Sequence, residues 1–259
     1  MQRIIAHRGA SAYAPENTLE AFELAVKMGA DGVELDVHMT RDGELVVAHD
    51  EEIGRVADGI GLIRNMTTSE LKKHRFNRTH PEFKDATIPT LREVYELLKP
   101  TGLMINTELK TSHIHYEHME EKCVRLADEL GMTDRVLYSN FDIASLRLLK
   151  RFNPDARVGL LRTPIGNINH RKLVDPWDLA HMLGIDAIHP HFSELLRYNE
   201  SDKAHAMGIQ VNVWTVNDEA DMRKCLAAGA DMLIGDCPDR MVKVRAEMQA
   251  EMQAGTARN

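Results

Sequence analysis

Hydrophobic runs rich in β-branched residues alternate along the chain with stretches that have the spacing of amphipathic helices. A glycine repeatedly marks the point where a helical stretch ends and a strand begins. Because glycine tolerates the left-handed conformation that ends a helix, each of these glycines indicates a C-terminal helix cap. Helix, glycine and strand in repetition predict βα units and a parallel sheet. The junctions are Met28-Gly29-Ala30-Asp31, Leu130-Gly131-Met132, Leu183-Gly184-Ile185-Asp186, Met207-Gly208-Ile209 and Ala228-Gly229-Ala230-Asp231.

These junctions delimit a regular series of strands and helices. The expected strands are Arg3–His7, Gly32–Val37, Leu103–Leu109, Arg135–Ser139, Arg157–Leu161, Ile185–Pro190, Ile209–Thr215 and Asp231–Gly235. The expected helices are Thr18–Met28, Leu91–Leu98, Tyr116–Leu130, Ile143–Arg151, Pro176–Leu183, Asn199–Met207, Asp218–Ala228 and a helix from Asp239 onward. This series predicts an α/β fold, a (β/α)8 TIM barrel that forms one domain over residues 1–259. A doubly wound open sheet is the alternative, but the glycine-rich phosphate turn of that fold is missing.

One stretch interrupts the alternation after the second expected strand. It contains a further strand-like run, Glu44–His49, which follows the turn Arg41-Asp42-Gly43. A glycine-containing region and a short helix with an N-cap signature at Thr68-Ser69-Glu70-Leu71 come next. We therefore expect a small insertion, about residues 39–89, above the barrel mouth rather than a second domain.

Charged residues stand where the strands of a barrel are normally apolar. Glu34 and Asp36 alternate with hydrophobic residues and so point to one face of their strand, and Glu108 lies in the next barrel strand. Burial of an unpaired carboxylate is costly unless a cation or hydrogen bonds offset it. Because carboxylate oxygens suit hard cations, we expect Glu34, Asp36 and Glu108 to bind one divalent metal ion, Mg²⁺ or Ca²⁺. Structural ion pairs with Arg8 and Lys110 are the alternative.

Other chemically active residues fall at the carboxyl ends of the strands, where a (β/α)8 barrel builds its active site. His7 ends the first strand, and His49 ends the strand-like run of the insertion. Arg8 has a planar guanidinium that suits phosphate oxygens. The remaining charged and aromatic residues expected at this rim are Glu16, Lys110 and Trp214.

Composition excludes several classes of function. The chain of 259 residues is 43% hydrophobic and 28% charged, as in globular proteins. A net charge of −8 argues against nucleic-acid binding, which needs a dense basic surface. Three scattered cysteines indicate neither a disulfide framework nor a zinc site. No run of about 18 apolar residues predicts a membrane span, and the lack of a visible secretory signal predicts a cytoplasmic protein.

Five short blocks, in order, carry a resemblance to a known family. They are His7-Arg8-Gly9, Pro15-Glu16-Asn17-Thr18, Glu34-Leu35-Asp36-Val37, His49-Asp50 and Glu108-Leu109-Lys110. Together they resemble the signature of glycerophosphodiester phosphodiesterases. The resemblance continues through Gly59-Ile60-Gly61-Leu62, Ile88-Pro89-Thr90-Leu91, Val213-Trp214-Thr215-Val216-Asn217 and Gly235-Asp236-Cys237-Pro238-Asp239, so it covers nearly the whole chain.

The resemblance implies a metal-dependent (β/α)8 barrel that hydrolyses glycerophosphodiesters, such as glycerophosphocholine and glycerophosphoethanolamine, to sn-glycerol 3-phosphate and an alcohol. Carried over by motif, the resemblance implies that Glu34, Asp36 and Glu108 bind the metal and that His7 and His49 form the acid–base pair. Arg8 and Lys110 would hold the phosphate. Glu16 would support His7 or the substrate glycerol, and Trp214 would line the pocket. The partner is then a small molecule. In schemes typical of the family, the glycerol hydroxyl attacks first and water opens the resulting cyclic phosphate.

Two rival functions stay open on the sequence. A lysophospholipase D-type activity on longer lipids would require a wide apolar channel at the barrel rim. A non-catalytic barrel that binds phosphorylated metabolites would be expected to lack His7 or His49, and both are present. Among the other histidines, His189 ends an expected strand and could contact substrate or pack in the core. A solvated loop and helix start are expected to hold His113, His115 and His118.

Overall fold

The computed structural model describes residues 2–162, 180–181, 183–199 and 201–256. Its parallel strands close into the predicted (β/α)8 barrel, because β1 pairs with both β9 and β2. The strands run in the order β1-β9-β8-β7-β6-β5-β4-β2, and β3 pairs with the carboxyl end of β2. Their bounds are β1 Arg3–His7, β2 Gly32–Met39, β3 Leu45–Val47, β4 Met104–Leu109, β5 Val136–Asn140, β6 Arg157–Arg162, β7 Ala187–Pro190, β8 Gln210–Val213 and β9 Met232–Gly235.

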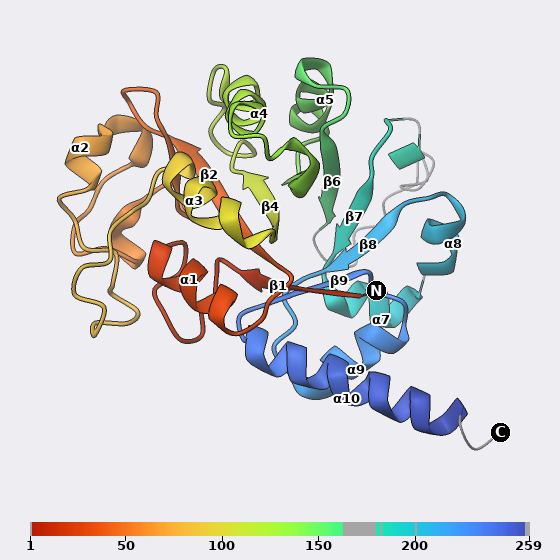
Figure 1. The fold of residues 1–259 in the computed structure, drawn as a ribbon. Helices are drawn as coiled ribbons and strands as arrows, with labels where there is room; N and C mark the ends of the chain where they lie inside the picture. Colours follow the sequence, from red (N-terminus) through yellow and green to blue (C-terminus); the bar gives the residue numbers. More distant parts are fainter. Residues whose placement is uncertain (1, 163–179, 182, 200, 257–259) are drawn as a thin grey trace.

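Helices surround the barrel on its outside (Figure 1). The α-helices are α1 Leu19–Lys27, α2 Thr68–Leu71, α3 Leu91–Leu98, α4 Met119–Glu129, α5 Ile143–Phe152, α7 Phe192–Tyr198, α8 Ser201–Ala206, α9 Glu219–Ala227 and α10 Pro238–Thr256. Short 3₁₀ helices are η1 Ile53–Arg55, η2 Ile63–Asn65, η3 Lys99–Thr101 and η4 Thr133–Arg135. Most expected strands and helices match these bounds to within three residues.

One helix of the structure was not predicted, and one expected helix falls mostly outside the described residues. The expected helix Asn199–Met207 corresponds to α8, whereas α7 was not predicted, and Asn199 lies between the two helices. Its backbone is left-handed, with φ of 40°, a conformation that asparagine adopts more readily than most residues and that ends α7. The expected helix Pro176–Leu183 lies for the most part outside the described residues.

The main hydrophobic core lies between the strands and the surrounding helices. Phe22 of α1, Leu35 of β2 and Tyr95 of α3 are fully buried members of it. A smaller cluster from the strands includes Ile5, Leu137 and Met232. Alternate residues of a strand face opposite sides, so Leu35 packs outward while Glu34 and Asp36 face the barrel interior.

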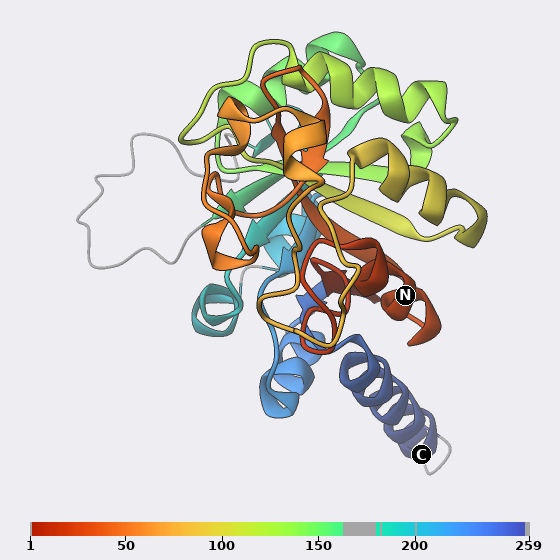
Figure 2. The ribbon, with the colours of Figure 1, turned by 90° about the vertical axis from the view of Figure 1, so that its left-hand side faces the viewer.

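The segment between β2 and α3 forms a layer beside the barrel mouth. Its strand β3 pairs antiparallel with β2, with Val47 opposite Val37 and Leu45 opposite Met39. A separate small core, which includes Ile53, Ile63 and Leu71, holds η1, η2 and α2 together. Figure 2 looks toward this segment, which lies in front of the barrel strands.

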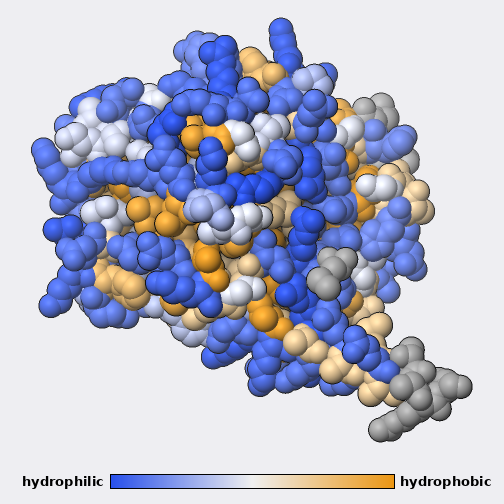
Figure 3. Space-filling view, in the orientation of Figure 1, coloured by the Kyte–Doolittle hydropathy of each residue, from blue (hydrophilic) through white to orange (hydrophobic). Residues whose placement is uncertain are grey.

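The face of the molecule in Figure 3 is mostly hydrophilic, with scattered hydrophobic residues. Within the part of the chain that the structure describes, no helix is both long enough and apolar enough to cross a membrane.

A capping box starts α3, where the chain returns from this segment to the barrel. The Thr90 hydroxyl accepts a hydrogen bond from the Glu93 amide, and the Glu93 carboxylate accepts one from the Thr90 amide. We expect Thr90→Ala to lower the free energy of unfolding by about 1 kcal/mol, which is a fall of about 2–4 °C in Tm. Thr90→Ser keeps the hydroxyl and is the control. Equal thermal melts for the alanine and serine variants would show that the cap does not stabilise α3.

Candidate active site

The residues predicted at the rim converge on one cavity of about 150 Å³ at the carboxyl ends of the strands. Seven of the predicted site residues line it: His7, Arg8, Glu34, His49, Glu108, Lys110 and Trp214. Asp36 lies beside Glu34 and Glu108, with ligand oxygens within 4.8 Å of one another. Glu16 is not among the lining residues. It instead contacts Arg8, whose Nη1 donates to Glu16 Oε1 at 2.9 Å, and the insertion residue Arg55.

Sheet register brings the three carboxylates together. Glu34 of β2 pairs with His7 of β1, and Asp36 of β2 pairs with Glu108 of β4. Since paired residues of neighbouring strands have side chains on the same face, the carboxylates form a compact group in the barrel mouth. Glu34 is 4% exposed and Asp36 is 1% exposed, so water screens their charges poorly.

Neighbouring cations only partly offset this negative charge. Lys110 Nζ lies 2.8 Å from Glu108 Oε1 and 3.4 Å from Asp36 Oδ1, and Arg8 Nε lies 3.4 Å from Asp36 Oδ2. Burial raises the pKa of Glu108 to about 7, although Lys110 opposes the shift. Burial, together with the charges of Asp36 and Glu108, raises the pKa of Glu34 well above its usual range. Burial also acts to raise the pKa of Asp36, but Lys110 and Arg8 outweigh it and hold that pKa below its usual range.

These residues fit a hard divalent cation. The group offers three carboxylates within 4.8 Å of one another, which is the ligand type that Mg²⁺ and Ca²⁺ take. Asp36 Oδ1 is buried and accepts no hydrogen bond from the described residues, so an acceptor is left over for a ligand. The pKa values of Glu34 and Glu108 are raised although Arg8 and Lys110 lie beside the group. A further positive charge would therefore favour the ionised form of both carboxyl groups.

The loop after β1 places Arg8 against this group. Arg8 has a left-handed backbone with φ of 55°, and its amide donates to Glu34 Oε2 at 3.0 Å. Gly9 follows with φ of 81°, and a Cβ there would lie 2.6 Å from the carbonyl carbon of Ala21 in α1. The His7-Arg8-Gly9 sequence therefore lets the chain turn sharply, so that both the amide and the guanidinium of Arg8 face carboxylates.

Each cavity histidine is held by an aspartate. His7 Nδ1 lies 2.6 Å from Asp236 Oδ1, and His49 Nδ1 lies 2.6 Å from Asp50 Oδ1. An ionised aspartate requires a proton on the Nδ1 that it binds, which leaves Nε2 free for chemistry. His7 Nε2 lies 4.0 Å from Glu34 Oε2, so it is directed toward the carboxylate group. Burial lowers the pKa of His49, and the charges of Arg8 and Lys110 add to that shift.

Neither aspartate was predicted as a site residue. Asp236 lies 229 positions from His7 and also accepts hydrogen bonds from Ser11 Oγ at 3.2 Å and Asn217 Nδ2 at 2.6 Å. Its position directly after the expected strand Asp231–Gly235 was the available signal. Asp50 is the immediate neighbour of His49, and that adjacency was its signal.

The far wall of the cavity is apolar. Trp214 is fixed by a hydrogen bond from Nε1 to the His189 carbonyl at 2.7 Å, and Phe141 meets its ring edge-on at 5.9 Å between centroids. The lining residues that the sequence analysis did not assign to the site are Asn106, Phe141, Leu161 and Ile234. The cavity therefore has a charged side from β1, β2 and β4 and an apolar side from the later strands.

The four other histidines singled out in the sequence do not line this cavity in the described part of the chain. His189 is fully buried, and its Nε2 lies 3.0 Å from the side-chain nitrogen of Asn212. His113 and His115 are exposed, with His113 3.5 Å from Glu51. His118 contacts Glu117 and Glu121 at the surface.

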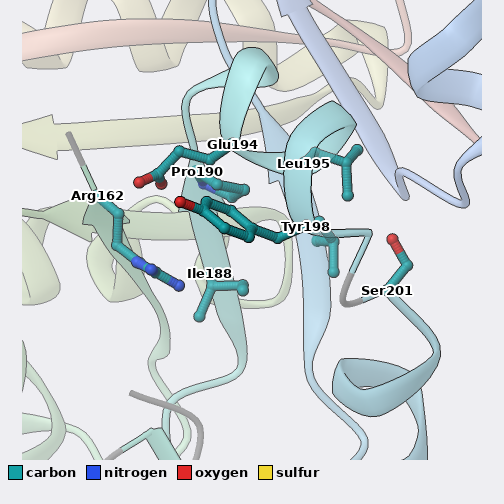
Figure 4. A pocket seen from close by; sticks show the side chains of 8 residues that line it. Arg162, Ile188, Pro190, Glu194, Leu195, Tyr198 and Ser201 are labelled. Atoms are coloured by element: carbon teal, nitrogen blue, oxygen red, sulfur yellow. The ribbon is translucent and has the colours of Figure 1, made fainter. Parts of the chain in front are cut away.

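A second, smaller cavity of about 20 Å³ lies beside β6, β7 and α7 (Figure 4). Arg162, Glu194 and Tyr198 provide its polar edge. Its described lining contains no histidine and a single carboxylate, so it lacks both an acid–base pair and a carboxylate group.

Comparison with known proteins agrees with this geometry. The profile of the glycerophosphoryl diester phosphodiesterase family matches residues 7–240. A glycerophosphodiester phosphodiesterase from Caldanaerobacter subterraneus subsp. tengcongensis is 37% identical over 243 residues, which are 93% of this chain and 96% of that protein. One from Bacillus altitudinis is 36% identical over 252 residues, 96% of this chain and 100% of the relative.

Solved structures give the same result. A phosphodiesterase from Oleispira antarctica, solved in complex with the product sn-glycerol-3-phosphate, is 29% identical with a TM-score of 0.81. The match covers 95% of this chain and 97% of that one. The chain therefore belongs to the glycerophosphoryl diester phosphodiesterase family, enzymes that hydrolyse glycerophosphodiesters.

Proposed function

We propose that this enzyme hydrolyses glycerophosphodiesters such as glycerophosphocholine and glycerophosphoethanolamine to sn-glycerol 3-phosphate and an alcohol, and that it needs one divalent metal ion to do so. The observation that carries the proposal is the arrangement of three buried carboxylates and two aspartate-bound histidines around one cavity. Residues 1–259 act as one domain in this proposal, and the insertion of about residues 39–89 supplies His49.

Glu34, Asp36 and Glu108 would hold the metal, which is Mg²⁺ or Ca²⁺. When bound, such an ion neutralises the carboxylates and stabilises negative charge on phosphoryl oxygens. Arg8 and Lys110 line the same cavity and supply further positive charge toward the phosphate. Trp214 and its apolar neighbours would contact the uncharged part of the substrate.

The two imidazoles account for the proton transfers. A free hydroxyl of the substrate glycerol attacks phosphorus, a new P–O bond forms, and the bond to the leaving alcohol oxygen breaks. One histidine accepts the hydroxyl proton while the other donates a proton to the leaving oxygen. Water then opens the cyclic phosphate with the two roles reversed. Asp236 and Asp50 keep each Nδ1 protonated, so that Nε2 of His7 and of His49 is the reacting atom.

The test is a direct assay of purified protein with glycerophosphocholine and either Mg²⁺ or Ca²⁺. We expect stoichiometric release of glycerol 3-phosphate and choline, and little activity on lysophosphatidylcholine, because the cavity that the described residues form measures only about 150 Å³. Faster turnover of lysophosphatidylcholine would favour the lysophospholipase D-type alternative. Tight binding without product would favour the non-catalytic barrel.

Removal of the metal should stop the reaction. We expect EDTA to abolish turnover and added Mg²⁺ or Ca²⁺ to restore it. Glu34→Gln and Glu108→Gln should each weaken metal binding at least about tenfold in isothermal titration calorimetry, because each removes a charged ligand. Glu129→Gln is the matched control, since Glu129 pairs with Arg92 on the exposed surface of α4. Unchanged turnover in metal-free buffer would contradict the proposed metal dependence.

Loss of either imidazole should remove one proton transfer. We expect His7→Ala and His49→Ala each to lower kcat by about 10²-fold or more with the circular dichroism spectrum unchanged. The surface variant His118→Ala should behave as the wild type, because His118 contacts only Glu117 and Glu121 among the described side chains. Near-normal kcat in both cavity variants would refute the acid–base assignment.

A further inference from the structure

One arginine of the insertion bridges two carboxylates that each serve a different part of the cavity. Arg55 ends η1, and its Nε donates to Asp50 Oδ2 at 2.5 Å. Its Nη1 and Nη2 donate to Glu16 Oε2 and Oε1, both at 2.7 Å. The planar guanidinium thus makes a two-pronged contact with Glu16 and a third contact with Asp50, a geometry that only arginine can supply.

Glu16 and Asp50, which accept hydrogen bonds from Arg55, also each bind one residue that lines the cavity. Asp50 binds His49 Nδ1 at 2.6 Å, and Glu16 binds Arg8 Nη1 at 2.9 Å. The contacts form a continuous chain from His49 through Asp50, Arg55 and Glu16 to Arg8. Arg55 is the central member, and it links the loop after β1 to the insertion, 39 positions apart in the sequence.

The position of Arg55 separates it from residues that touch substrate. It is not among the residues that line the cavity, and 44% of its side chain is exposed. The side chains of Glu16 and Arg8 are only 14% and 18% exposed. This series of contacts is therefore shielded from water at Glu16 and Arg8 and open to solvent at Arg55. An exposed ion pair on its own stabilises a protein little, so the effect of Arg55 on stability should be small.

Loss of Arg55 would release two side chains from their present orientation. Glu16 would keep only Arg8 as a charged partner among the described residues, and Asp50 would keep only His49. Each could then rotate, and the imidazole and guanidinium that they hold would lose their common orientation toward the phosphate. Misplacement of catalytic groups by about 1 Å can cost about 10²-fold in rate.

We propose that Arg55 is a positioning residue of this enzyme: by clamping Glu16 and Asp50 together, it sets His49 and Arg8 at the same phosphoryl group. This inference rests on the proposed function, since it assumes that His49 moves a proton and that Arg8 binds phosphate. It assigns to the insertion a part in catalysis beyond the supply of His49.

The experiment compares R55M and R55K with a matched control on the same segment. Arg41 is also an insertion arginine, with Nη2 3.1 Å from Glu70 Oε2 and Nη1 donating to the Asn65 carbonyl at 2.9 Å, and its side chain is 56% exposed. R41M therefore removes a similar ion pair that does not lead to the cavity. All proteins are assayed with glycerophosphocholine and Mg²⁺, and their thermal midpoints are measured in parallel.

We expect R55M to lower kcat/KM about 10- to 100-fold, with a thermal midpoint within a few degrees of that of R41M. R55K should recover only part of the loss, because an ammonium group cannot span both carboxylates. A further variant, R55A, leaves space for the missing group, and guanidinium ion at millimolar concentration should partly restore its activity. The double variant R55M/E16Q should be no slower than R55M alone, because both changes break the same chain of contacts.

Three results would overturn the inference. R55M with wild-type kcat and KM would show that the clamp does not serve catalysis. A fall in the thermal midpoint of R55M much larger than that of R41M, with no rescue of R55A by guanidinium, would assign Arg55 a structural role. Rate losses of R55M and E16Q that multiply would show that the two residues act independently. If the wild type and R41M both fail to hydrolyse any glycerophosphodiester, the proposed function itself is wrong. If the wild type is active and R55M has the same activity, only the inference about Arg55 is wrong.

Discussion

The structure depends on one electrostatic constraint, the concentration of negative charge in the barrel mouth. Glu34, Asp36 and Glu108 lie with their oxygens within 4.8 Å of one another, and two cations, Arg8 and Lys110, contact them directly. Burial raises the pKa of Glu34 and of Glu108, whereas Asp36 keeps a low pKa because both cations lie beside it. The group therefore has the oxygen ligands and the excess negative charge that suit a divalent cation.

The same constraint explains why the main hydrophobic core lies outside the barrel strands rather than in the barrel mouth. Charged residues in the mouth weaken the interior of the barrel, since they replace apolar packing there. The large hydrophobic cluster lies instead between the strands and the helices, where Leu35 and Phe22 are fully buried. A second, separate cluster holds the insertion together. Stability and chemistry are therefore carried by opposite faces of the same strands, as alternation of side chains along a strand allows.

Much of this arrangement could be predicted from local sequence. The two-residue spacing of Glu34 and Asp36 in a hydrophobic strand is enough to place both carboxylates on the inner face. The glycine junctions fix the order of strands and helices, and thus which residues reach the rim. The prediction was weaker where tertiary context decides: the seven-residue helix α7 was not predicted, and it ends at the left-handed Asn199, where the expected helix was thought to begin.

Contacts between residues far apart in the sequence were also not predicted. Asp236 reaches His7 only because the barrel closes between β9 and β1, and no local pattern encodes a contact across 229 positions. The role expected for Glu16, support of His7 or of the substrate glycerol, stays a prediction, but its contacts with Arg8 and Arg55 were not foreseen. The contact between Glu16 and Arg55 depends on how the insertion packs against the first βα loop, which the local sequence does not indicate.

Closure of the barrel and docking of the insertion therefore complete the two histidine sites in different ways. His7 is oriented by Asp236, which follows the last barrel strand, so its geometry depends on the β9–β1 pairing that closes the sheet. His49 is oriented by its own neighbour Asp50, and His38 donates from Nε2 to the His49 carbonyl at 3.1 Å. One histidine is thus positioned by the scaffold and the other by a docked segment. The orientation of the His49 imidazole therefore depends on how the insertion is attached to the barrel, and that of His7 on how the barrel closes.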